Sequence, residues 1–117
     1  MKKILFVDDD PNMQRMVEIL LRNEDLELIF AGNGRSALKQ MDRHDFDMIF
    51  SDIQMPEMDG LTLLAEVRSR QPHLPFIIIS AFGQESMEKK ALDAGASRVL
   101  NKPFDRDKLL SIINDFG

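Results

Sequence analysis

Residue types that can do chemistry stand directly after four short apolar runs of this sequence. They are the aspartates Asp8, Asp9 and Asp10, the pair Ser51 and Asp52, the hydroxyl of Ser80, and Asn101 with Lys102. Two like charges about 4 Å apart repel by roughly 4 kcal/mol at an effective dielectric near 20, so clustered carboxylates favour a bound cation such as Mg²⁺. A carboxylate can also attack phosphorus and form an aspartyl phosphate. A metal ion, a lysine and a hydroxyl would then stabilise the charge on the transferred group.

Each of these residues alone also has an ordinary explanation. Asp10 precedes Pro11 and fits a helix N-cap with proline at the first helical position. Ser80 alone is typical of a strand end, and Lys102 alone is typical of a surface. Their joint placement after successive apolar runs is what favours a functional site.

The elements that must position these residues alternate between two patterns. Apolar runs typical of buried strands cover residues 4–7, 26–31, 48–50, 76–79 and 99–100. Helical spacing of apolar residues covers residues 11–21, 36–43, 61–70 and 84–94, and a last helix follows Asp105. The third helix is expected to bury Leu61, Leu64 and Val67, and Gly95 is expected to end the fourth in a left-handed conformation. This alternation predicts a doubly wound α/β domain with five parallel strands and five helices. Ligands of such sheets bind beyond the carboxyl ends of the strands, where the polar residues would meet.

Composition limits the remaining classes of function. The 117 residues suit one domain, and we expect residues 1–117 to form it without an output domain. A net charge of −5 argues against direct nucleic-acid binding, and no apolar run is long enough for membrane insertion. The absence of cysteine excludes disulfides and thiolate metal sites. These features predict a cytoplasmic location.

Four segments resemble the receiver domain of two-component response regulators. They are Ile4–Asp10, Ser51–Gly60, Ser80-Ala81 and Lys102-Pro103-Phe104. The resemblance extends from Lys2 to Phe116. It implies a flavodoxin-like fold with strand order 2-1-3-4-5, in a stand-alone receiver of a two-component or phosphorelay system.

The resemblance implies a chemical role for three residues. Asp52 would accept a phosphoryl group from a phosphohistidine on a sensor histidine kinase or a histidine phosphotransfer protein. Lys102 would pair with the acceptor and then with the phosphoryl group, and Ser80 would move to bond a phosphoryl oxygen. The domain would not be an enzyme beyond its own phosphorylation and dephosphorylation.

The resemblance also implies a site for Mg²⁺ or Mn²⁺. Asp9 and Asp52 would bind the ion directly, Asp8 largely through water, and Gln54 through its backbone carbonyl. Pro56 and Gly60 would shape the adjoining loop, where we expect glycine to permit a tight turn.

The signalling face would lie within residues 80–116 and would alter contacts with a downstream protein target. Many family members carry an aromatic ring three residues before the lysine, and this chain has Val99 there. An aromatic switch at that position is therefore excluded, and signalling must rest on Ser80, its loop and the fourth helix. The resemblance further implies a cis bond before Pro103. It also implies that Gln54 and Phe82 tune hydrolysis; Phe82 could either shield the acyl phosphate from water or pack on its own loop.

Two other functions fit part of the pattern. Asp8 and Asp10, followed by Ser80 and Lys102, are similar in order to the motifs of haloacid-dehalogenase-like phosphatases. Asn12 stands where that family prefers Thr or Val, and no later acidic pair is expected on another strand end, because only fifteen residues follow Lys102. The second alternative is a receiver-like interaction module that is not phosphorylated, for which Val99 is weak support. Flavin binding is set aside, because there is no glycine-rich loop after the first strand and no Trp or Tyr.

Overall fold

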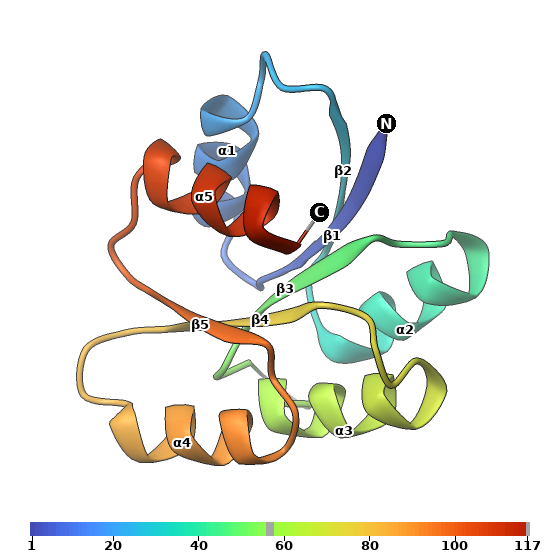
Figure 1. Ribbon diagram of the computed structural model, residues 1–117, viewed down its shortest axis with the longest axis vertical. Helices are drawn as coiled ribbons and strands as arrows, with labels where there is room; N and C mark the ends of the chain where they lie inside the picture. Colours follow the sequence, from blue (N-terminus) through green and yellow to red (C-terminus); the bar gives the residue numbers. More distant parts are fainter. Residues whose placement is uncertain (56–57, 117) are drawn as a thin grey trace.

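A five-stranded parallel sheet forms the centre of the molecule (Figure 1). The computed structural model describes residues 1–55 and 58–116. The strands are β1 (Lys2–Val7), β2 (Leu26–Ala31), β3 (Met48–Asp52), β4 (Phe76–Ser80) and β5 (Arg98–Asn101). Their order across the sheet is β2-β1-β3-β4-β5, and all four strand pairs are parallel. The fold class and strand order expected from the sequence are therefore confirmed.

Within the described residues, four helices connect the strands and a fifth follows β5. They are α1 (Pro11–Leu20), α2 (Gly34–Arg43), α3 (Gly60–Arg70), α4 (Glu85–Asp93) and α5 (Arg106–Phe116). Asp10 caps α1 as predicted, because its side chain accepts a hydrogen bond from the Asn12 N–H. Asn33 and Asp59 cap α2 and α3 in the same way. Gly95, which follows α4, has φ of 108°, the left-handed conformation that was expected.

The helices cover both faces of the sheet and divide the core in two. Helices α1 and α5 lie on one face, and α2, α3 and α4 lie on the other (Figure 1). Side chains of β1 enter both halves of the core. Ile4 and Phe6 pack on the face covered by α1 and α5, and Leu5 and Val7 pack on the face covered by α2, α3 and α4. Burial on both faces explains why the strands read as continuous apolar runs.

One core prediction needs correction in α3. Leu61 is only partly buried, whereas Leu63 is completely buried beside Leu64 and Val67. The helix begins at Gly60 and packs both Leu63 and Leu64 under the sheet, so its apolar stripe lies further round the helix than the pattern of Leu61, Leu64 and Val67 indicates.

The strand register determines which side chains meet at the carboxyl edge. Val7 pairs with Ser51, so Asp8 and Asp52 follow at the same level on neighbouring strands. Asp52 pairs with Ile79, and Ser80 pairs with Asn101. This edge therefore collects the polar residues that the sequence places after each strand. None of the helices in the described residues is long and apolar enough to cross a membrane.

Candidate functional site

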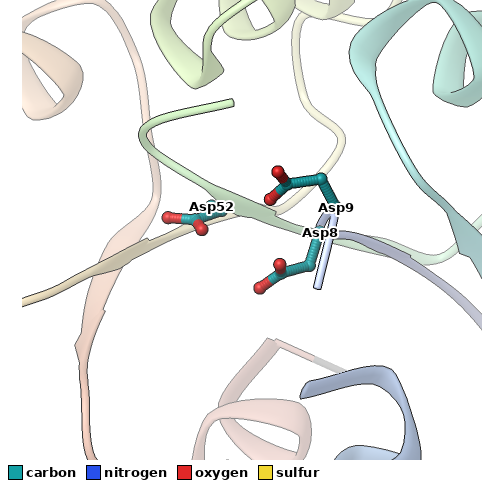
Figure 2. A group of neighbouring side chains, drawn as sticks. All are labelled: Asp8, Asp9 and Asp52. Carbon is teal, nitrogen blue, oxygen red and sulfur yellow. The ribbon is translucent and has the colours of Figure 1, made fainter. Parts of the chain in front are cut away.

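Three carboxylates gather where β1 and β3 end, Asp8 and Asp9 directly after β1 and Asp52 as the last residue of β3 (Figure 2). Asp8, Asp9 and Asp52 each offer an oxygen, and these oxygens all lie within 4.8 Å of one another. Asp8 is buried, Asp52 is partly buried and Asp9 is exposed. The cluster is therefore open to solvent on the Asp9 side and closed beneath.

The Asp8 carboxylate is fixed in place, but only one of its two oxygens accepts a hydrogen bond from the described residues. Its Oδ1 accepts a hydrogen bond from the Asp10 N–H at 2.9 Å, and its carbonyl accepts one from Gln14 Nε2 at 2.9 Å. Its Oδ2 is buried and has no hydrogen-bond partner among the described residues. Burial raises the pKa of the Asp8 carboxyl above its ordinary value, the bond from Asp10 opposes this, and the nearby charge of Asp52 adds to it.

Lys102 brings one positive charge to the cluster. Its Nζ lies 3.2 Å from Asp52 Oδ2 and 3.9 Å from Asp8 Oδ2. The Lys102 N–H donates to the Ser80 carbonyl at 2.8 Å, which fixes the backbone directly after β5. The bond between Lys102 and Pro103 is cis, as the resemblance implied.

The site fits a hard divalent cation. Three carboxylates face a single ammonium group, which leaves excess negative charge at the edge of the sheet. Asp8 Oδ2, which accepts no hydrogen bond from the described residues and lies 3.9 Å from Lys102 Nζ, supplies a buried oxygen at the same cluster. Oxygen donors of this kind are what Mg²⁺ and Mn²⁺ prefer.

The loop after β3 passes close beneath Gly60. The Ile53 N–H donates to the Ile79 carbonyl, and the Gly60 N–H donates to the Ile53 carbonyl. A Cβ on Gly60 would lie 2.5 Å from the Asp52 carbonyl oxygen and 2.9 Å from Ile53 Cα. Glycine is thus needed here for the close approach of backbone, rather than for the turn conformation that was expected. Pro56 lies outside the described residues.

Gln54 lies two residues after the end of β3, and its side chain is exposed. Its side-chain Nε2 donates to Met87 Sδ on α4 at 3.7 Å. The loop that carries its backbone carbonyl is thereby in contact with α4, which sequence reasoning did not anticipate.

Ser80 is completely buried, and its hydroxyl is engaged with α4 and the loop before it. The hydroxyl oxygen lies 2.8 Å from Glu88 Oε2, 3.3 Å from Gln84 Oε1 and 3.2 Å from the Ala81 carbonyl. Asn101 Nδ2 donates to the same Glu88 oxygen at 3.1 Å. Sequence analysis missed Glu88. The available signal was the helical spacing of Gln84 and Glu88, one turn apart, at the start of the helix that follows Ser80.

The other residues singled out from the sequence lie around this centre. Phe82 is 95% exposed, and with Glu85, Glu88, Asn101 and Lys102 it lines a cavity of about 270 Å³. Val99 is partly buried in β5. A larger hollow of about 460 Å³ is lined by residues of β5 and α5 and by none of Asp8, Asp9 and Asp52.

Asp10 stands apart from the carboxylate cluster. Its side chain is exposed and caps α1. Asp10, which would be the second acid of a haloacid-dehalogenase-like site, therefore serves as a helix cap.

Comparison with known proteins agrees with this fold. The family described as response regulator receiver domain matches residues 4–114. The chemotaxis protein CheY of Bacillus subtilis is 39% identical over 113 residues, which are 96% of this chain and 94% of that protein. The transcriptional regulatory protein GlrR of Escherichia coli is 36% identical over 112 residues. That match covers 96% of this chain but only 25% of GlrR, so the chain spans about a quarter of such a relative.

Solved structures give the same result. The chemotaxis response regulator CheY4 of Vibrio cholerae superposes with a TM-score of 0.91 at 30% identity, over 100% of this chain and 99% of that one. The receiver domain of NtrX from Brucella abortus has a TM-score of 0.91 at 31% identity, over 97% and 96%. The chain belongs to the response regulator receiver domains of two-component systems. It resembles CheY proteins along nearly their whole length.

Proposed function

We propose that Asp52 is the phosphoacceptor of this domain. The observation that carries the proposal is the contact of Asp52 with Lys102 at 3.2 Å, inside a cluster of three carboxylates. A carboxylate oxygen of Asp52 attacks the phosphorus of a phosphohistidine. The P–N bond breaks, its electron pair returns to the imidazole nitrogen, and an acyl phosphate forms on Asp52.

Lys102 and the two other aspartates complete the site. Lys102 Nζ lies between Asp52 and Asp8, where it offsets negative charge on the carboxylate and then on the phosphoryl oxygens. Asp8, Asp9, Asp52 and the backbone carbonyl of Gln54 would hold Mg²⁺ or Mn²⁺. When bound, that ion supplies Lewis-acid stabilisation of the transferring phosphoryl group.

Ser80 is proposed to donate a hydrogen bond to a phosphoryl oxygen. Ser80 ends β4 on the strand next to β3, one position beyond the residue that pairs with Asp52. Its hydroxyl has a single hydrogen, so it must leave its present acceptors to make this bond.

The partners follow from the reaction. The phosphodonor is a sensor histidine kinase or a histidine phosphotransfer protein, and the output is a changed contact between α4, β5, α5 and a protein target. The cytoplasmic location stays a prediction, as does the organisation of residues 1–117 as a single domain without an output domain.

Beryllofluoride, which mimics an aspartyl phosphate, tests the proposal. We expect beryllofluoride with Mg²⁺ to shift the amide resonances of Asp52, Ser80 and α4 in the wild-type protein. The variant Asp52→Ala should show none of these shifts. An unresponsive wild type would support the alternative of an interaction module that is not phosphorylated, and an equal response in Asp52→Ala would contradict the proposal.

A further inference from the structure

The hydroxyl of Ser80 has a charged partner on α4. Glu88 Oε2 lies 2.8 Å from Ser80 Oγ, the shortest of the three acceptor distances at that oxygen. The Ala81 carbonyl lies at 3.2 Å, and Gln84 Oε1 lies at 3.3 Å and already accepts the Ala81 N–H at 2.7 Å. A hydroxyl donates one hydrogen, and a carboxylate is the stronger acceptor. The Ser80 hydroxyl therefore donates to Glu88.

Glu88 is itself held in place from β5. Asn101 Nδ2 donates to the same Oε2 at 3.1 Å, and Asn101 precedes Lys102 in the chain. Glu88 is partly buried, and it lines the cavity that reaches Lys102. The carboxylate is thus fixed between the end of β4, the end of β5 and the first turns of α4.

We propose that Glu88 is a positioning residue of the phosphoacceptor site, which acts through Ser80. Its carboxylate retains the Ser80 hydroxyl on α4, so the hydroxyl bonds a phosphoryl oxygen only after the contact with Glu88 breaks. The inference rests on the proposed role of Asp52. Because the acceptor is on α4, phosphorylation releases a contact of that helix directly, without an aromatic residue at position 99.

The equilibrium consequence is a lower apparent affinity for the phosphoryl group. When a ligand binds only a minor conformation, its apparent affinity is its intrinsic affinity multiplied by the fraction of molecules in that conformation. Loss of the competing acceptor should raise that fraction. We expect Glu88→Ala to lower the beryllofluoride midpoint about fivefold, the effect of one partly exposed, charge-assisted hydrogen bond.

The experiment is a beryllofluoride titration at fixed Mg²⁺, followed by the amide resonances of Ala81 and Asp52. Glu88→Gln retains an acceptor oxygen of the same shape without charge, so its midpoint should lie between those of the wild type and Glu88→Ala. In the resting state, Glu88→Ala should move the Ala81 amide resonance toward its position in the beryllofluoride complex. Thermal unfolding of each variant verifies that it is folded.

Two controls separate this role from a general effect of charge. Glu85 lies one turn earlier on α4 and lines the same cavity, and the structure describes no hydrogen bond between it and Ser80. Glu85→Ala removes the same charge and should leave the midpoint near that of the wild type. In a Ser80→Ala background, Glu88→Ala should have no further effect, because its action requires the hydroxyl.

Each outcome decides between the two proposals. An unchanged midpoint in Glu88→Ala, an equal shift in Glu85→Ala, or an undiminished shift in the Ser80→Ala background would overturn the role of Glu88. The proposed function fails in a different way, by the absence of any response in the wild-type protein.

Discussion

Asp8 carries an electrostatic cost at the centre of the site. Its Oδ2 is buried without a hydrogen bond, and burial raises the pKa of its carboxyl above the ordinary value. A carboxyl whose pKa is raised by folding destabilises the folded state when it is ionised. The contribution of Asp8 to stability is therefore greatest below the ordinary pKa of an aspartate and is lost as the pH rises through the raised pKa of folded Asp8.

Removal of this charge should stabilise the metal-free protein. We expect Asp8→Asn to raise the melting temperature by a few degrees at neutral pH in the presence of a chelator. The difference should disappear as the pH is lowered through the pKa of Asp8, where the wild-type carboxyl becomes neutral. Thermal unfolding over a range of pH measures both.

The neighbouring Asp10 provides the control for this prediction. Asp10→Asn removes a charge two residues away while keeping an equally good N-cap, so its melting temperature should stay close to that of the wild type. A lower melting temperature for Asp8→Asn at neutral pH would contradict the electrostatic account.

Phe82 is the most exposed large apolar side chain among the described residues. Its ring is 95% exposed and lines the same cavity as Lys102. If it shields the acyl phosphate, Phe82→Ala should shorten the half-life of phosphorylated Asp52 in an autodephosphorylation assay. The fold should be unaffected, with a change in stability within about 0.5 kcal/mol. An unchanged or longer half-life would contradict the shielding role.

At the scale of elements, the junction of β3 and α3 depends on Gly60. A Cβ there would meet backbone atoms of Asp52 and Ile53 at 2.5 and 2.9 Å, and backbone cannot rotate away as a side chain can. Gly60→Ala should cost about 1–3 kcal/mol of stability and also slow phosphorylation, because the loop it displaces carries Asp52 and Gln54. Chemical denaturation and phosphorylation kinetics measure the two effects.

Gly32 offers a matched substitution. A Cβ at Gly32 would meet nothing within 4 Å, so Gly32→Ala should be nearly neutral. A Gly60→Ala variant as stable and as reactive as Gly32→Ala would show that the loop can move without consequence.

The elements were largely predictable, because each leaves a local signal in the sequence. The run Ile4–Val7 is apolar on both faces, and Asp10-Pro11 starts a helix, so β1 and α1 follow from nearest neighbours. The bounds of most elements differ from the prediction by one or two residues; β1 begins at Lys2 rather than Ile4, and α2 begins at Gly34 rather than Ser36. Leu63 was missed because the rotation of α3 under the sheet depends on tertiary packing.

The site was predictable to the extent that it follows from strand ends. Parallel strands share a carboxyl edge, so the meeting of Asp8, Asp9, Asp52 and Lys102 follows from topology. The contact of Ser80 with Glu88 does not follow from the topology, since it depends on how α4 packs against β4 and β5. The close approach at Gly60 is likewise a three-dimensional fact without a local signature.

At the scale of the whole molecule, one edge of the sheet concentrates the chemistry and the signalling. Three aspartates and Lys102 stand at the end of the strands, and α4 touches that edge through both Ser80 and Gln54. The same domain matches nearly all of the CheY of Bacillus subtilis and a quarter of GlrR. The region that matches the receiver family, residues 4–114, includes Asp8, Asp9, Asp52 and Lys102.

The most direct test of this account is the intact mass of the protein after incubation with acetyl phosphate and Mg²⁺. The wild type should gain the mass of one phosphoryl group, and Asp52→Asn should gain none. Asp10→Asn should be labelled like the wild type, because Asp10 only caps α1. Labelling of Asp52→Asn to the same extent as the wild type, with its loss in Asp8→Asn, would contradict the account and favour a phosphatase-like nucleophile at Asp8.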